Sequence, residues 1–185
     1  MVERGIGVLV VIRGMIILAI EVNLTSAEPF EGAMLVLTFR VAGVPYAVAV
    51  RRVVEVVPRV ALRELPHAPG YLAGLLRYRG GAVPVVDLGV LMGGAACSDR
   101  LDTRIILVDG GAIGTVGLIA ERVDDVRAVD ESRRAVAGLA VGEAPYLGPV
   151  YDTDDGLLQL VEPGKIEVGM AGAGAPRMLG DGGGA

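Results

Sequence analysis

Short runs of hydrophobic residues, separated by glycine and proline, make up most of the chain between residues 34 and 168. Leu35, Leu37, Phe39 and Val41 alternate with the residues between them, which is the period of two typical of a strand. Further extended runs follow at 46–50, 60–65, 75–79, 82–87, 104–109, 112–120, 123–129, 146–151 and 157–161, and 52–57 is extended or a short helix. This pattern predicts an all-β fold with short helices, with about eight to ten strands in a sandwich or in small barrels.

Pairs of glycines mark the turns between several of these strands. Gly80-Gly81 joins 75–79 to 82–87, and a second pair at 110–111 joins the two runs around it. Because a tight hairpin turn needs residues at positive φ, both pairs predict β-hairpins.

The two ends of the chain differ from this body. Residues 1–33 form an atypical apolar extension, in which Arg13 interrupts the apolar run 5–20. A membrane-spanning helix needs about 20 apolar residues and tolerates a central arginine poorly, so direct membrane insertion is not expected. A targeting segment, a downstream start of translation and an additional strand or helix all remain open for this extension. Residues 169–185 are rich in Gly and Ala and predict a flexible tail.

Composition limits the chemistry that the chain can perform. A length of 185 residues fits one domain or two small subdomains that share a core. The net charge of −5, with acidic groups spread along the chain, argues against nucleic acid as a partner. Cys97 is the only cysteine and His67 the only histidine, which excludes a disulfide framework and metal sites built from several such ligands. We therefore expect no metal and no cofactor.

One pair of acidic residues is compatible with catalysis. Asp87 and Asp109 each stand at the end of an extended run, shortly before glycine. Two close carboxylates on a β framework can share a proton, so a small β-barrel hydrolase that uses Asp87 and Asp109 is the alternative hypothesis. The simpler interpretation is that each carboxylate accepts N–H bonds in the turn that follows it.

The segment 71–88 carries the most specific pattern in the chain. Its residues Gly74, Arg79-Gly80, Pro84 and Asp87-Leu88 have the spacing G-x-x-x-x-R-G-x-x-x-P-x-x-D-L. We expect Arg79 at a hairpin tip, where its guanidinium reaches outward or pairs with a carboxylate, while Gly80 supplies the turn conformation. A proline within an extended run is typical of an edge or bulged strand.

This spacing resembles the central motif of the CheW-like family, the adaptor domains of bacterial chemotaxis signalling. The resemblance extends to both sides of the motif, from an opening hairpin at 35–50 to a later hairpin at 104–126, and covers about residues 34–165. The chain departs from the family pattern at Arg77, where the family usually has Asn.

The resemblance implies a domain at 34–168 made of two small five-stranded β-barrel subdomains. It also implies a non-catalytic, cytoplasmic scaffold that couples the cytoplasmic tip of a chemoreceptor, a methyl-accepting chemotaxis protein, to the regulatory domain of a CheA-type histidine kinase. The receptor helix would lie in a groove between the barrels. The positions that correspond to the protein-binding surface around this groove are Val53, Glu55, Gly74, Arg79, Gly80, Gly117, Val123 and Val126.

The residue types themselves leave two interpretations of this set open. Valines with one acid and one base at their rim suit the recognition of a helix in an apolar groove. Alternatively, Val53, Val123 and Val126 belong to the barrel core, and Glu55 and Arg79 pair with each other.

Overall fold

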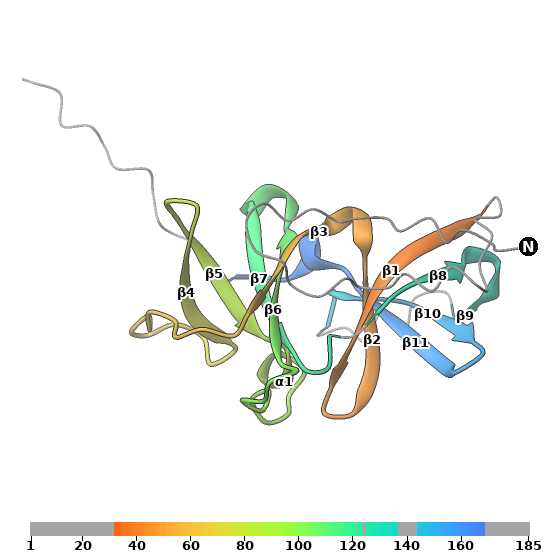
Figure 1. Cartoon of the computed structure of the whole chain (residues 1–185), viewed down its shortest axis with the longest axis horizontal. Helices are drawn as coiled ribbons and strands as arrows, with labels where there is room; N and C mark the ends of the chain where they lie inside the picture. The colour runs from red at the N-terminus through yellow and green to blue at the C-terminus, as the bar shows by residue number, and fades with distance from the viewer. Residues whose placement is uncertain (1–31, 124, 137–143, 169–185) are drawn as a thin grey trace, which may run out of the picture.

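Two β-sheets form the domain, and the computed structural model describes residues 32–123, 125–136 and 144–168 (Figure 1). The first sheet has six strands in the order β8-β1-β2-β11-β10-β9. These strands are β1 (Ala33–Val41), β2 (Val44–Ala49), β8 (Val126–Asp130), β9 (Arg134–Val136), β10 (Leu147–Thr153) and β11 (Gly156–Val161).

The second sheet has five strands in the order β3-β6-β7-β5-β4 and lies on the left in Figure 1. These strands are β3 (Val53–Pro58), β4 (Leu72–Tyr78), β5 (Gly81–Asp87), β6 (Arg104–Asp109) and β7 (Thr115–Ala120). The helices of the described residues are all short. They are η2 (Val50–Arg52), α1 (Leu88–Leu91), η3 (Gly111–Ile113), η4 (Glu131–Arg133) and η5 (Pro163–Lys165).

In chain order, all five strands of the second sheet lie between β2 and β8 of the first sheet. The chain forms β1 and β2, crosses at η2 into the second sheet, and returns to the first sheet at β8. The returning segment runs along β1, where Arg40 and Glu121 exchange backbone hydrogen bonds at 2.7 and 3.0 Å. Thr38 N–H donates to the carbonyl of Asp125 at 2.8 Å. These bonds attach the crossing segment to β1, beyond the residues that pair with β8.

Three hydrophobic cores fill the described part of the domain. The first-sheet core contains Met34, Val36, Ala47, Ala49, Val129, Tyr151, Leu158 and Leu160. The second-sheet core contains Leu76, Val83, Val85, Cys97, Ile105, Leu107 and Ile119. The largest core joins the two sheets, and we call it the seam core. It contains Leu37, Phe39, Val41, Val48, Leu72, Val86, Leu88, Ile106, Val108, Val116, Leu118, Ala120, Tyr146, Val161, Ile166 and Val168.

Strands at the seam bury both of their faces. In β1, Val36 belongs to the first-sheet core, whereas Leu37 belongs to the seam core. In β6, Ile105 belongs to the second-sheet core, whereas the next residue, Ile106, belongs to the seam core. Because successive side chains of a strand point to opposite faces, burial of both faces gives a continuous apolar run, as at 105–108 in β6. The seam is therefore an integral hydrophobic layer, and separating the sheets would expose it to water.

The second sheet closes on itself. Its edge strands are β3 and β4, but the segment after β3 returns to β4, where Arg63 and Leu75 exchange backbone hydrogen bonds at 2.8 and 3.0 Å. The Glu55 carboxylate on β3 also accepts hydrogen bonds from Tyr78 and Arg79 at the end of β4. Both contacts bring the two edges together, as expected for a small barrel.

The predicted all-β class with two β subdomains is confirmed. The first sheet has one strand more than the predicted five, because β9 spans three residues and is too short to show a period in the sequence. The turn between β4 and β5 also differs by one residue from the predicted Gly80-Gly81. Arg79 and Gly80 have φ angles of 47° and 83°, and Gly81 begins β5. Positive φ at both central residues suits a two-residue hairpin turn.

The predicted domain boundaries were residues 34 and 168. In the structure, β1 begins at Ala33, and Val168 is the last described residue of the domain. Residues 1–31 and 169–185, which include most of the predicted extension and the whole predicted tail, lie outside the described residues. Among the residues that the structure describes, no helix has the length and hydropathy needed to cross a membrane.

Candidate protein-binding surface

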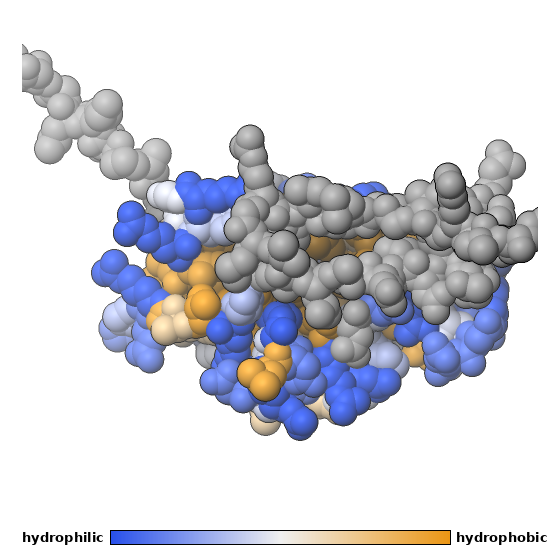
Figure 2. Space-filling view, viewed as in Figure 1, coloured by the Kyte–Doolittle hydropathy of each residue, from blue (hydrophilic) through white to orange (hydrophobic). Residues whose placement is uncertain are grey.

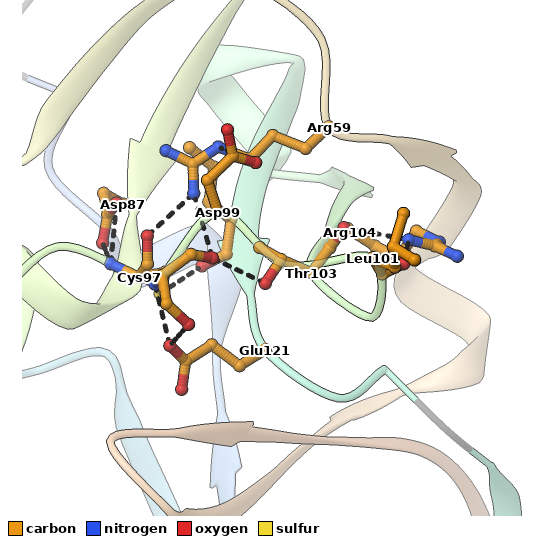
Figure 3. A network of polar contacts seen from close by, with 10 residues as sticks. Arg59, Asp87, Cys97, Asp99, Leu101, Thr103, Arg104 and Glu121 are labelled. Carbon is orange, nitrogen blue, oxygen red and sulfur yellow. Dashed lines mark hydrogen bonds and ion pairs between the residues drawn. The ribbon is translucent and has the colours of Figure 1, made fainter.

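A buried carboxylate organises the loop that follows β5. Asp87 is 4% exposed, and its Oδ1 accepts hydrogen bonds from the N–H groups of Gly89 at 2.9 Å and Val90 at 3.3 Å, which caps α1. Both carboxylate oxygens also accept from the N–H of Cys97 at 3.1 Å. Figure 3 shows Asp87 beside Cys97 in this network. The carboxylate therefore holds the loop 93–103 against the end of β5.

Side chains from other segments fix the rest of this loop (Figure 3). Arg59 donates to the carbonyl of Cys97 at 2.8 Å, and the Thr103 hydroxyl donates to the carbonyl of Ser98 at 2.7 Å. The Glu121 carboxylate accepts from the N–H and the hydroxyl of Ser98 at 2.8 and 2.6 Å. These two bonds lower the pKa of Glu121, because they favour its charged form. The loop is thus bound to Glu121, directly after β7, and to the segment after β3.

Asp109 lies far from Asp87. Its carboxylate accepts a hydrogen bond from the N–H of Gly111 at 2.9 Å. Asp87 lies opposite Ile119 on β7, whereas Asp109 lies opposite Thr115 at the other end of the same strand. Four residues of strand separate these two positions by about 13 Å, so the carboxylates cannot share a proton. The hydrolase hypothesis is therefore not supported, and both carboxylates accept turn N–H bonds, as the simpler interpretation predicted.

Cys97 and His67 have environments that do not suit catalysis. Cys97 is buried, and its thiol donates to the carbonyl of Ile119 at 3.4 Å. Burial, together with the nearby charge of Asp87, raises the pKa of the thiol to about 12, so the reactive thiolate does not form at neutral pH. His67 lies exposed in the loop between β3 and β4. Within the described ranges, no group of three His, Cys, Asp or Glu side chains is placed to hold a metal ion.

Glu55, Tyr78 and Arg79 form a polar cluster where the second sheet closes. Arg79 Nη2 lies 3.2 Å from Glu55 Oε2, and the Tyr78 hydroxyl donates to the same oxygen. The Arg79 guanidinium also lies over the Tyr78 ring, with its Cζ 4.9 Å from the ring centroid. The Glu55 side chain is 16% exposed and that of Arg79 is 64% exposed. The pairing that the sequence left open is therefore present, and Arg79 still presents most of its side chain to solvent.

The three predicted glycines have different surroundings. A Cβ on Gly74 would lie 2.6 Å from the carbonyl oxygen of Arg63, and the residue has a φ of +143°. A Cβ on Gly117 would lie 2.9 Å from a methyl group of Ile105 inside the second sheet. Gly80 lies exposed in the hairpin turn, with open space around it. Gly74 and Gly117 are buried and allow close packing, so Gly80 is the one of the three that lies at the surface.

The three predicted valines lie at the edge of the seam core. Val53 begins β3, Val126 begins β8, and Val123 lies in the segment that crosses between the sheets. Each is partly buried and packs against the seam core. Part of each side chain therefore belongs to the fold, and the remainder is exposed to solvent.

Two exposed hydrophobic residues extend this edge, and the sequence reasoning missed both. Leu35 is 47% exposed and follows the same face of β1 as Leu37, which pairs with Val126. Val54 is 43% exposed and is the extra residue of a bulge directly after Val53. We call this set of residues the seam strip: Leu35, Val53, Val54, Val123 and Val126.

The bulge places Val53 and Glu55 on opposite faces of β3. Val53 pairs with Val108 of the seam core, whereas Glu55 pairs with Leu107 of the second-sheet core. Cross-strand partners share a face of the sheet, so the valines and the Glu55 cluster do not form one flat surface. β3 is an edge strand whose Glu55 contacts the end of β4, so Val53 and Val54 lie on the seam side of this closure.

A separate apolar hollow lies between the beginnings of β5 and β7. Its volume is about 450 Å³, and Val83, Pro84 and Ile113 are among the residues that line it. The two strands pair from Val85 and Gly117 onward, so the hollow occupies the gap before this point. Figure 2 shows hydrophobic surface over β4 and β5. The lining residues provide apolar contact and no charged group.

The chain belongs to the CheW-like domain family, whose sequence profile matches residues 35–167. The crystal structure of the scaffolding protein TtCheW from Thermoanaerobacter tengcongensis has a similar fold, with a TM-score of 0.64 and 25% identity. The match covers 73% of this chain and 88% of that chain. The family that the central motif predicted is thus confirmed.

Curated relatives show the same similarity over shorter segments. The chemotaxis protein CheW of Rhizobium meliloti (strain 1021) is 28% identical over 101 residues, which is 55% of this chain and 64% of that protein. The chemotaxis protein CheW of Helicobacter pylori is 26% identical over 84 residues, 45% of this chain and 51% of that protein. The matched segments therefore span less than two thirds of the length of these relatives.

Proposed function

We propose that the chain is a non-catalytic adaptor that couples chemoreceptors to a CheA-type histidine kinase in a bacterial chemosensory complex. Its membership of the CheW-like family and its likeness to a scaffolding protein support this proposal. Its partners are the cytoplasmic tip of the receptor and the regulatory domain of the kinase, and the adaptor therefore acts in the cytoplasm.

The seam strip is the observation that carries the proposal. Leu35 and Val54 expose hydrophobic side chains beside valines that are only partly buried. A group of accessible apolar side chains at one edge is typical of a surface that another protein covers. Burial of apolar area contributes about 25 cal/mol per Å², so the strip supplies affinity without any chemical reaction.

A receptor helix fits this edge better than a small molecule does. One apolar face of a helix, laid across the beginning of β3, would cover Val53 and Val54 and reach Leu35. Arg79 lies at the other side of the same strand, and its exposed guanidinium is available to a carboxylate on the helix. Such an exposed ion pair contributes only about 0–1 kcal/mol, so Arg79 sets the position of the helix more than the strength of binding.

Co-sedimentation tests the proposed function. Membranes that contain the chemoreceptor of the source organism are mixed with its CheA-type kinase, with and without the full chain, and then pelleted. We expect the chain to pellet with receptor-containing membranes and to increase the amount of kinase in the pellet. Membranes from which the receptor gene has been deleted are the control. A chain that stays in the supernatant, or an unchanged amount of kinase in the pellet, would contradict the proposal.

A further inference from the structure

A hollow of about 310 Å³ lies where the β1–β2 turn meets the loop 98–102 and the end of β7. Three of the residues that line it are arginines, namely Arg40, Arg100 and Arg122. They come from three different segments, so the fold brings together positive charges that are far apart in the sequence. The hollow therefore concentrates cations in a chain whose net charge is −5.

The two acids of the hollow already have partners. Glu121 accepts both hydrogen bonds of Ser98 described above. Oδ1 of Asp102 lies 3.7 Å from Nε of Arg100 and accepts no hydrogen bond from the described residues, and Oδ2 lies 3.8 Å from Nε of Arg122. Three arginines therefore face two carboxylates, and the lining keeps an excess of positive charge.

Most N–H groups of these arginines have no acceptor within the described residues. Arg40 donates one side-chain hydrogen bond, to the carbonyl of Gly43 at 2.7 Å. The side chains of Arg100 and Arg122 approach Asp102 only at ion-pair distance, and neither donates a hydrogen bond to another residue that the structure describes. Because a guanidinium carries five N–H donors, the hollow offers many donors to an incoming carboxylate.

The backbone around the hollow holds two side chains in unusual positions. Arg122 has a φ of 44°, in the left-handed region that a long side chain rarely adopts. Leu101 is 95% exposed, between Arg100 and Asp102. Its carbonyl accepts a hydrogen bond from Arg104, and the loop is fixed by the network in Figure 3. Leu101 is therefore a hydrophobic side chain presented by an ordered loop beside the arginines.

We propose that this hollow and Leu101 form a second docking site, which binds an acidic segment of a partner protein. A carboxylate of the segment enters among Arg40, Arg100 and Arg122, and a neighbouring apolar side chain of the segment covers Leu101. The site is distinct from the seam strip and does not depend on the receptor contact proposed above. Because its charges are close to solvent, binding weakens as the salt concentration rises.

Amide chemical shifts of the ¹⁵N-labelled full chain test this site, with a hexaglutamate peptide at low salt as the probe. We expect shifts concentrated at Gly43, Ser98, Arg100 and Arg122, and none at these positions with hexalysine. The variant that combines Arg100→Gln with Arg122→Gly removes two cations. Glycine accepts the left-handed backbone at 122, so the variant keeps its fold. We expect its affinity for hexaglutamate to fall about threefold for each arginine removed.

The control combines Arg77→Gln with Arg134→Gln, which changes the net charge equally at two exposed positions outside the hollow. We expect this control to keep most of the wild-type affinity. Shifts spread evenly over the molecule, equal losses in both double variants, or shifts of the same size with sodium acetate at matched carboxylate concentration would each overturn the proposal.

Discussion

Glu55 and Arg79 join the two edge strands of the second sheet, with Oε2 and Nη2 3.2 Å apart. The acid lies on β3 and the base in the β4–β5 turn, and Tyr78 donates to the same carboxylate oxygen. The contact therefore closes the second barrel at the same edge where the seam strip begins. Glu55 is largely buried in this contact, whereas most of the Arg79 side chain remains exposed to solvent.

The Glu55–Arg79 pair should contribute little to stability. Because Arg79 is 64% exposed, water screens the interaction, and we expect a coupling free energy of about 1 kcal/mol or less. A double-mutant cycle with Glu55→Gln and Arg79→Gln, followed by urea unfolding, measures it. A coupling well above this value would mean that the pair is structural.

In the co-sedimentation assay, Arg79→Glu should reduce binding to receptor membranes while thermal unfolding stays nearly unchanged.

Gly117→Ala should destabilise the domain by about 1–3 kcal/mol. The added Cβ would lie 2.9 Å from a methyl group of Ile105 and 3.0 Å from one of Val85, in the middle of the second sheet. Urea unfolding measures the loss. Gly70→Ala is the matched control, because its Cβ would meet nothing within 4 Å and its φ is not in the left-handed region. Equal effects of the two substitutions would show that close packing at 117 is not the cause.

Asp87→Ala should destabilise the domain by about 2–4 kcal/mol. The substitution removes the acceptor of the N–H groups of Gly89, Val90 and Cys97 at a buried position. Asp109→Ala should change stability by less than about 1 kcal/mol, since its side chain is 55% exposed. Thermal unfolding of both variants provides the comparison, and a larger loss at Asp109 would contradict this description of the two carboxylates.

Glu121 should make the stability of the domain depend on pH in the acid range. Its folded pKa lies below the ordinary value of 4.5, because Ser98 donates two hydrogen bonds to the charged form. This contribution to stability is present above the ordinary value and is lost as the pH falls through the folded value. Melting temperatures of wild type and Glu121→Gln should therefore differ at pH 7 and converge toward pH 3. Glu64→Gln, at an exposed loop position, should show no such convergence.

Much of the fold could be predicted from the sequence because most strands are long enough to show their pattern. The run Leu35 to Val41 lies in β1, and β6 and β7 form the predicted hairpin. The predicted tight turn at Gly110-Gly111 is wrong, because a longer loop that contains η3 joins the two strands and Gly110 has a φ of −85°. The central motif identified the family because Arg79-Gly80 and Asp87 keep the spacing of a turn and a helix cap, and both roles are observed. Strand β9 could not be predicted, because three residues are too few to show an alternation of apolar and polar positions.

The arrangement of the candidate site could not be predicted in the same way. Residues two apart in a regular strand share a face, so the sequence predicts that Val53 and Glu55 lie on one surface. The bulge at Val54 turns them to opposite faces, and no residue type in the sequence marks that bulge. The exposure of Leu35 could not be predicted, because Leu35 and the buried Leu37 occupy equivalent positions in the alternation. The pairing of β1 with β2 ends at Val36, so β2 does not cover Leu35.

Binding of two matched leucine variants to receptor-containing membranes tests most directly whether the seam strip holds a partner. Leu35 and Leu157 are both exposed, at 47% and 62%, but only Leu35 belongs to the strip. A charged residue in an apolar interface is strongly unfavourable, so Leu35→Glu should weaken binding about tenfold or more, while Leu157→Glu should bind like wild type. Both variants should unfold at temperatures close to wild type. Wild-type binding by Leu35→Glu, or an equal loss in both variants, would contradict the assignment of this surface.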